Sequence, residues 1–259
     1  MWHLMQTAPL PAAWNMGIDA ALLERARATG DTVLRVYSWS RPALSLGRHQ
    51  RAVGLYDAAR ATGQGVDVVR RPTGGRALLH SREVTYSVTA PTAGERPRES
   101  YARINRLLLD GLRRMGVRAL LASPSAPATR PGDAPCFLTP SSGELVVGDR
   151  KLVGSAQWRE RGAFLQHGSI LVDDDQHVLG ELALRMFPAS PPAATLRECL
   201  GRDATPGEVA TALFASVRAL EDSAAVPLAD DALNDRTPLG DAARRLTKHF
   251  ADDGWTWRT

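Results

Sequence analysis

Apolar residues recur along this chain with two different spacings, and the change between them marks its elements. Spacings of three and four residues over 15–28 and 101–115 predict two amphipathic helices. Short runs rich in β-branched and aromatic residues predict strands between and after these helices. The strand segments are 32–39, 42–47, 65–70, 77–80, 83–90 and 162–172, and we expect 77–80 and 83–90 to pair as a hairpin.

Turn residues and weaker periodicities complete the predicted organisation. Gly148-Asp149 marks the turn of a second hairpin over 144–153. Strands dominate the middle of the chain and helices flank them, so we predict an α+β fold with a mixed sheet in one domain over residues 1–259. The remaining predicted segments are helices at 53–62 and 177–186, a surface loop at 122–135 rich in proline, alanine and serine, and a helix-rich part from about residue 191.

The composition is that of an ordinary globular protein. Hydrophobic residues make up 44% of the chain and charged residues 23%. We see neither a membrane-spanning apolar stretch nor a secretory signal. The two cysteines, Cys136 and Cys199, are far apart, so a disulfide framework or a zinc site is not expected. We therefore expect a cytoplasmic protein with free thiols and no bound metal.

The net charge of the chain says little about which kinds of partner it binds. The net charge of +4 is a mild basic excess that could steer acidic protein partners towards the molecule. No basic run is interleaved with aromatic residues, so nucleic acid is not an expected partner. For most of these charges a solvated, mixed-charge surface is the more typical interpretation.

A glycine pair flanked by arginines is the first candidate for chemistry. Gly74 and Gly75 follow the predicted strand at 65–70, and glycines there let the backbone approach a ligand closely. Arg71 and Arg76 could contact a phosphate or an acidic partner. By itself this motif is more typical of a tight turn between strands.

Three further features are also ambiguous when each is considered alone. Lys151 precedes a small-residue turn and could hold developing negative charge, although a solvated hairpin lysine is more common. A histidine beside a glycine in an apolar strand, as at His167, is usually a hydrogen-bonded core residue. Cys136 lies in a proline-rich segment where a nearby cation would favour its thiolate, yet most cysteines are inert.

Considered together, these features resemble the superfamily of lipoate and biotin protein ligases, and in particular its cysteine-dependent octanoyltransferases of the Gram-positive type. The resemblance covers most of the chain and suggests the mixed sheet and flanking helices of that catalytic domain. The motifs that carry it are Asn15-Met16 with Asp19, 41–47, 70–77, Thr85-Tyr86-Ser87, Cys136-Phe137 with Pro140-Ser141, Lys151 with 154–157, 166–171 and Trp255-x-Trp257.

The resemblance implies a reaction and a set of site residues. In that family an octanoyl group passes from acyl carrier protein to a lysine of a lipoyl domain, such as glycine-cleavage H protein or a 2-oxoacid dehydrogenase E2. Cys136 would carry the octanoyl group as a thioester, Lys151 would stabilise the oxyanion, and no cofactor is needed. The implied substrate-binding residues are Arg71, Gly74, Gly75, Arg76, His80, Gly154, Ser155, Ala156, His167 and Gly168, with His80 and His167 shaping the pocket rather than transferring protons.

Other functions are compatible with the same motifs. One is an ATP-dependent lipoate ligase, although Arg76 stands where such ligases commonly have a third glycine. Another is an amidotransferase that moves octanoyl between lipoyl domains, and a third is a non-catalytic binder of acylated domains. Ser81 also departs from the family, which often has aspartate there. Cys199 has no activating neighbour and is expected to be a packing residue, and the protein is expected to be a monomer.

Overall fold

The computed structural model describes residues 1–123, 143–187, 191–229 and 231–258. Most strands of these ranges form one mixed sheet, in which β11, β1 and β2 run parallel to one another and the other neighbouring pairs are antiparallel. The predicted mixed sheet is therefore confirmed. Its order is β11 (Val226–Pro227), β1 (Trp2–Gln6), β2 (Thr32–Tyr37), β6 (Glu83–Pro91), β10 (Ala163–Leu171), β9 (Arg150–Glu160), β8 (Leu145–Val147) and β7 (Leu120–Leu121).

A second, smaller sheet lies beside the first and carries the glycine-rich loop. Its order is β4 (Asp67–Arg70), β3 (Ala43–Leu46) and β5 (Leu78–His80). The predicted hairpin between β5 and β6 is wrong, because β5 pairs with β3 whereas β6 pairs with β2 and β10. Ser81 and Arg82 carry the chain from one sheet to the other. Both strands are buried, so the hydrophobic pattern did not identify their partners.

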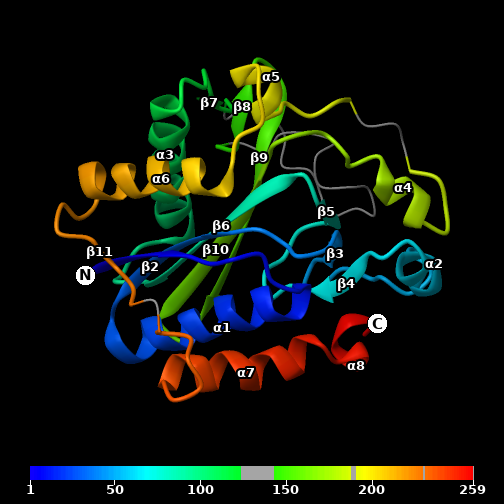
Figure 1. The fold of residues 1–259 in the computed structure, drawn as a ribbon, viewed down its shortest axis with the longest axis horizontal. Helices are drawn as coiled ribbons and strands as arrows, with labels where there is room; N and C mark the ends of the chain where they lie inside the picture. The colour runs from blue at the N-terminus through cyan, green and yellow to red at the C-terminus, as the bar shows by residue number, and fades with distance from the viewer. Residues whose placement is uncertain (124–142, 188–190, 230, 259) are drawn as a thin grey trace.

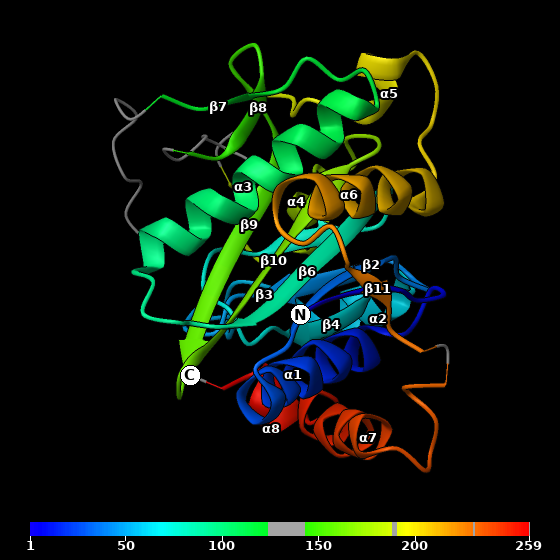
Figure 2. The ribbon, with the colours of Figure 1, turned by 90° about the vertical axis from the view of Figure 1, so that its left-hand side faces the viewer.

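Helices cover both faces of the large sheet (Figures 1 and 2). α3 (Pro97–Arg114) and α6 (Pro206–Leu220) pack together on one face, and α1 (Ala12–Thr29) with α7 (Pro238–Phe250) covers the other. Within the described ranges, no helix has both the length and the apolar character needed to cross a membrane. The short helices are α2 (Ala58–Gly63), α4 (Val178–Leu182), α5 (Leu196–Leu200) and α8 (Asp253–Thr256).

Local sequence explains the two long helices on the α3 side. Pro97 and Pro206 both occupy a first helical turn, where the missing N–H costs no hydrogen bond. Thr205 accepts a hydrogen bond from the backbone N–H of Glu208, which completes a capping box. Apolar residues of α3 at helical spacing, such as Ile104 and Leu108, are fully buried in the main core against the sheet.

The sequence located most of these elements but not their ends. The helix predicted at 53–62 begins only at Ala58, and β1 was not predicted. The hairpin predicted at 144–153 is confirmed, with Gly148 in the left-handed conformation at φ 62°. Cys199 packs against the main core as expected. Cys136 and most of the predicted loop at 122–135 lie outside the described residues.

Candidate active site

A pocket lies between the small sheet and the α1 face of the large sheet. Its cavity volume is only about 40 Å³, well below the roughly 300–1,000 Å³ typical of small-molecule sites. Strands of both sheets, the glycine-rich loop and one residue of α1 supply its walls. The residues that line it are Met16, Tyr37, Trp39, Arg71, Gly75, Leu78, His80, Thr85, Gly154, Ser155, Ala156, His167 and Gly168.

The pocket has an outer end at β9 and an inner end at β2 and α1. Gly75 is exposed, and Ser155 is partly exposed. In contrast, Met16, Tyr37 and Thr85 are 1%, 0% and 2% exposed. The strand registers pair Gly154 of β9 with Ser169 of β10, Ser169 with Thr85 of β6, and Thr85 with Tyr37 of β2. The pocket therefore runs across the strands, from the edge of the site at β9 towards the interior.

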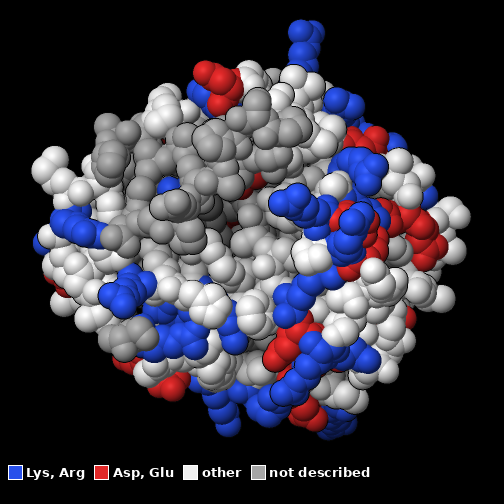
Figure 3. All heavy atoms as spheres, turned by 180° about the vertical axis from the view of Figure 1, so that it is seen from behind, with Lys and Arg blue, Asp and Glu red and all other residues white. Residues whose placement is uncertain are grey.

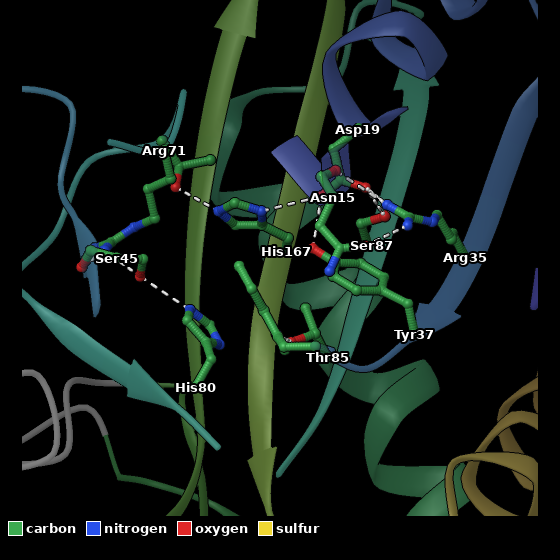
Figure 4. Close-up of polar contacts among 12 residues, drawn as sticks. Asn15, Asp19, Arg35, Tyr37, Ser45, Arg71, His80, Thr85, Ser87 and His167 are labelled. Atoms are coloured by element: carbon green, nitrogen blue, oxygen red, sulfur yellow. Dashed lines mark hydrogen bonds and ion pairs between the residues drawn. The ribbon is translucent and has the colours of Figure 1, made fainter. Parts of the chain in front are cut away.

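A buried carboxylate, Asp19 of α1, organises the inner end (Figure 4). Arg35 Nη1 donates to Asp19 Oδ1 at 2.8 Å, and the Tyr37 hydroxyl donates to Oδ2 at 2.9 Å. Ser87 Oγ also donates to Oδ1, at 2.8 Å. Burial alone would raise the pKa of Asp19, but the hydrogen bond from His167 and the charge of Arg35 outweigh it and hold that pKa below its ordinary value. Asp19 is therefore ionised, although it has no contact with solvent.

His167 of β10 links this carboxylate to the glycine-rich loop. Its Nδ1 lies 3.3 Å from Asp19 Oδ2, and its Nε2 lies 2.6 Å from Thr73 Oγ1. Burial lowers the pKa of His167, so the ring is neutral at pH 7. We assign the proton to Nδ1, facing the carboxylate, and Thr73 then donates its hydroxyl hydrogen to Nε2. The ring thus fixes the position of Thr73, which directly precedes Gly74 and Gly75.

A second set of hydrogen bonds lies behind the opposite wall of the pocket. The ring of Trp39 stacks on His80 with centroids 4.0 Å apart, and its Nε1 donates to Thr85 Oγ1 at 2.8 Å. Thr85 in turn donates to the buried carboxylate of Glu83 at 2.7 Å. His80 Nε2 lies 2.9 Å from Ser45 Oγ, and its Nδ1 is 3.4 Å from Glu83 Oε1 without hydrogen-bond geometry.

These two sets of hydrogen bonds make an apolar surface from polar side chains. Five polar or aromatic side chains line the pocket: Tyr37, Trp39, Thr85, His80 and His167. Their polar atoms already form hydrogen bonds with other protein groups. These atoms are the Tyr37 hydroxyl, the Trp39 N–H, the Thr85 hydroxyl, both nitrogens of His167 and Nε2 of His80. Because these groups are already hydrogen-bonded, they do not need a polar ligand. The chemistry of this lining therefore suits a hydrocarbon chain.

The glycine-rich loop is held by backbone contacts. Arg71 donates to the carbonyl oxygens of Ser45 at 2.9 Å, Gly74 at 2.7 Å and Arg76 at 2.8 Å. Gly75 has φ 92°, a region that favours glycine. A Cβ on Gly47 would lie 1.9 Å from the Gly75 carbonyl oxygen. The close approach of the backbone at 47 to the backbone at 75 therefore requires glycine at position 47. Arg71 holds the loop through its hydrogen bonds to backbone carbonyls.

Arg70 connects the same region to a segment far away in sequence. Its guanidinium is fully buried and donates to the carbonyls of Gly47 and Gln50, both at 2.7 Å. It also donates to the carbonyls of Thr256 at 2.9 Å and Arg258 at 3.2 Å. Arg70 thus joins the loop after β3 to the segment around α8.

Lys151, the predicted electrostatic catalyst, is buried at the start of β9. Its Nζ lies 2.9 Å from Glu144 Oε1, and the two residues are 3% and 6% exposed. The pairing of β8 with β9 shifts register beside it, and a bulge of this kind commonly re-aims a side chain near an active site. Lys151 is not among the described residues that line the pocket. The predicted nucleophile, Cys136, lies outside the described residues.

The structure brings most of the predicted binding residues together. The pocket residues that the sequence had indicated are Arg71, Gly75, His80, Gly154, Ser155, Ala156, His167 and Gly168, whereas Gly74 and Arg76 are not among its lining residues. Sequence reasoning gave no role to Thr73, Glu83 or Trp39. The sequence did contain an indication that Asp19 is buried, because this carboxylate lies on the same helical face as the apolar residues Met16 and Leu22.

Within the described ranges, no three histidine, cysteine, aspartate or glutamate side chains lie close enough together to hold a metal ion. The cysteine that is described, Cys199, is partly buried. Burial and the charge of Glu198 raise the pKa of the Cys199 thiol, so it is a poor nucleophile at neutral pH.

Comparison with known proteins gives a consistent result. The family described as the lipoyl protein ligase A/B catalytic domain matches residues 11–218. The octanoyltransferase LipM of Kyrpidia tusciae is 38% identical over 99% of this chain and 98% of its own length. That of Staphylococcus aureus is 40% identical over 67% of each chain. The bipartite lipoate protein ligase of Thermoplasma acidophilum, described with its E2 lipoyl domain, has the same fold, with a TM-score of 0.75 at 19% identity over 99% of this chain and 96% of that one.

Proposed function

Because the chain belongs to the lipoyl protein ligase A/B catalytic-domain family, we propose that it transfers an octanoyl group from acyl carrier protein to a lysine of a lipoyl domain. It is an acyltransferase, as are the octanoyltransferases that it resembles along almost its whole length. The proposed acceptor is the lipoyl-domain class that includes glycine-cleavage H protein and the E2 subunits of 2-oxoacid dehydrogenases. The product is the octanoylated lysine required for lipoate biosynthesis.

The apolar inner surface of the pocket is the observation that carries this proposal. An extended chain advances about 1.2 Å per bond, so an octanoyl chain spans about 8 Å from its carbonyl carbon to its methyl group. Strands lie about 4.8 Å apart, which puts β6 about 10 Å from β9. A chain whose carbonyl lies over Ala156 would therefore end near Thr85 and Met16. The chain is therefore long enough to cross from β9 to β6, and it can enter only if the walls of this narrow cavity move apart.

The proposed chemistry proceeds in two balanced steps through Cys136. The Cys136 thiolate attacks the octanoyl thioester, and the carrier leaves as its thiol after taking up a proton. The amine of the acceptor lysine then attacks the Cys136 thioester, loses a proton and forms an amide, which regenerates the cysteine. Thioester exchange is nearly balanced and amide formation is downhill, so the reaction needs no nucleotide. Covalent catalysis also allows the two protein partners to bind in turn.

In this scheme Lys151 supplies positive charge for the oxyanion of both tetrahedral intermediates. The ion pair with Glu144 supports this role, because a carboxylate 2.9 Å away fixes the position of the ammonium group. The pair is buried, so its charges are weakly screened. Lys151→Ala should lower the acylation rate by about 100-fold or more. A rate close to that of the wild type would remove Lys151 from the mechanism.

Intact-mass measurement after incubation with octanoyl-acyl carrier protein tests the proposal directly. The wild-type protein should gain the mass of one octanoyl group, and hydroxylamine should remove it. Cys136→Ala should show no adduct, whereas Cys199→Ala, the matched control, should be acylated normally. An adduct that persists in Cys136→Ala would show that another residue is the nucleophile.

The same assay separates the alternative functions. An ATP-dependent lipoate ligase would modify a lipoyl domain when given lipoate and ATP, at a rate comparable with octanoyl transfer. An amidotransferase would accept the octanoyl group from an octanoylated lipoyl domain faster than from acyl carrier protein. A non-catalytic binder would show neither an adduct nor modification of the acceptor.

A further inference from the structure

Three arginines gather around a polar hollow beside the loop that follows β3. Arg48, His49, Gln50, Arg70 and Arg258 line this hollow. Seen from behind, the molecule has a recess near its centre, with Lys and Arg side chains gathered at several places around it (Figure 3). The hollow has no assigned role in the acyl-transfer reaction described above.

Within the described part of the chain, the arginines of this hollow have no direct ion-pair partner. No carboxylate there lies within 4.0 Å of the guanidinium nitrogens of Arg48, Arg70 or Arg258. Burial and then the charge of Arg258 lower the pKa values of both Arg48 and Arg70, and the charge of Glu160 offsets only part of this effect at Arg48. Cations held together against their mutual repulsion create a strong local attraction for an anion.

The hollow also offers hydrogen-bond donors that no described protein group uses. The guanidinium of Arg48 makes no hydrogen bond to a described residue, and the buried Nε2 of Gln50 has no partner among them. Gln50 Oε1 accepts from the backbone N–H of Gly47 at 3.2 Å, which orients the amide. A buried hydrogen-bond donor without an acceptor lowers the stability of the fold unless a bound ligand supplies that acceptor.

Aromatic rings hold the two outer guanidinium groups in place. The guanidinium carbon of Arg48 lies 4.1 Å from the centre of the Trp158 ring, and that of Arg258 lies 3.9 Å from the Trp255 ring. Arg258 Nη2 also donates to the backbone carbonyl of Arg48. A stacked guanidinium presents its edge, with its N–H donors, in a fixed direction. These donors are therefore preorganised rather than free on a mobile surface.

The hollow adjoins the outer end of the acyl pocket. The backbone N–H of Arg48 donates to the Thr73 carbonyl at 2.8 Å, and a Cβ on the preceding Gly47 would meet Gly75. Trp158, on which Arg48 stacks, follows the pocket residue Ala156 by two positions on the same face of β9. A donor that places its acyl group in the pocket would therefore pass beside these arginines.

We propose that the Arg48–Gln50–Arg258 hollow is a phosphate subsite that binds the phosphodiester of the acyl carrier's pantetheine arm. Arginine forks bind phosphate oxygens in pairs, and a phosphodiester has enough acceptors to engage two guanidinium groups and an amide at once. The inference rests on the proposed function, since it assumes an acyl donor that carries this arm.

Donors with and without the phosphate group test the subsite. The acylation rate constant kcat/KM is measured by intact mass with octanoyl-4′-phosphopantetheine and with octanoyl-pantetheine. The wild-type protein should prefer the phosphorylated donor about tenfold or more, the range expected for hydrogen bonds to a charged group. Arg48→Gln should bring this preference close to one. Arg114→Gln, a surface change on α3, is the control and should keep the wild-type preference.

Gln50→Glu separates ligand binding from a structural role. It keeps the oxygen that accepts from Gly47 and puts a carboxylate among the arginines, so thermal stability should stay equal or rise. The preference for the phosphorylated donor should nevertheless disappear, since the carboxylate repels phosphate. Equal rates for both donors in the wild type, or a wild-type preference that survives in both variants, would overturn the subsite while leaving octanoyl transfer intact. Calorimetric titration with 4′-phosphopantetheine itself, against pantetheine, examines the subsite without acyl transfer, and equal affinities would overturn it.

Discussion

Asp19 Oδ2 and His167 Nδ1 lie 3.3 Å apart although 148 residues separate them in sequence. Both side chains are buried, and their contact joins α1 to β10 beneath the pocket. Because Asp19 also binds Arg35, Tyr37 and Ser87, one carboxylate sets the positions of three strands relative to α1. The inner end of the pocket is therefore a rigid, hydrogen-bonded structure rather than a set of independent side chains.

Replacing Asp19 should destabilise the protein strongly at neutral pH. Asp19→Asn leaves the fully buried guanidinium of Arg35 without its counter-charge, a change that costs about 3–5 kcal/mol of the free energy of unfolding. Chemical denaturation at pH 7 measures the loss. Asp31→Asn, which removes a partly exposed ion pair of Arg25, is the control and should cost about 1 kcal/mol or less. Similar losses in the two variants would show that the buried pair is not exceptional.

The same residues predict how stability depends on pH. The folded-state pKa of His167 lies below the ordinary value of 6.5, so the unfolded chain takes up its proton first and stability falls as the pH drops below about 6.5. Asp19, whose pKa is also lowered, contributes stability above pH 3.8 that is lost as the pH falls through its folded-state pKa. Denaturation curves between pH 7 and pH 5 should show the first effect, and His167→Gln should reduce it to what His249, whose pKa burial also lowers, contributes. An unchanged slope in that variant would assign the pH dependence to other groups.

Replacing Thr73 should weaken binding of the octanoyl donor, although Thr73 is not one of the residues that line the pocket. Thr73→Val keeps the shape but leaves the buried Nε2 of His167 without its donor, at a cost of about 1–3 kcal/mol. Since Gly74 and Gly75 follow directly, we expect KM for the octanoyl donor to rise while the acyl-enzyme still forms. Thr73→Ser retains the hydroxyl and should restore both stability and KM. A serine variant that behaves like the valine variant would point to packing of the methyl group instead.

Gly168 should tolerate no side chain. A Cβ there would lie 2.4 Å from the Gly154 carbonyl oxygen and 2.8 Å from Tyr86 Cε1. Because the first of these neighbours is backbone, Gly168→Ala should cost several kcal/mol, which overpacking of a buried sheet can reach. Gly180→Ala in α4, where a Cβ meets nothing within 4 Å, should leave the melting temperature almost unchanged. Near-equal melting temperatures for the two variants would contradict the packing described here.

The inner end of the pocket should determine which acyl chains are accepted. Met16 is 1% exposed and lines that end. Met16→Ala should let dodecanoyl donors acylate the protein about tenfold faster relative to octanoyl, because each additional buried CH₂ contributes about 0.8 kcal/mol once space exists. The measurement is a series of donors from hexanoyl to tetradecanoyl. Met5→Ala, a core change in another cluster, is the control and should keep the wild-type profile.

The sequence was sufficient to predict the fold class and most elements, since their apolar spacing is strong and local. Periodicity located α1 and α3 because Ile18, Leu22, Ile104 and Leu108 recur at helical intervals and are all buried. It failed for the partner of β5, because pairing depends on which strand is adjacent in space, and a fully buried strand has no polar face to indicate it.

The site was only partly predictable for a related reason. Gly75 and His167 were identified because glycine and histidine in a motif indicate close approach or hydrogen bonding. The stack of Trp39 on His80 and the carboxylate of Glu83 behind Thr85 depend on contacts between two sheets. Nothing local to 37–39 or 83–85 indicates that they meet.

The hydrogen bonds of Arg70 have a consequence for how the molecule is made. They tie the loop at 47–50 to Trp255, Thr256 and Arg258, which follow Arg70 by 185, 186 and 188 positions. Contacts over such separations carry a large loop-closure cost and slow the folding of a chain that depends on them. In a growing chain on the ribosome, the guanidinium of Arg70 therefore lacks these carbonyl partners until residues 255–258 have emerged.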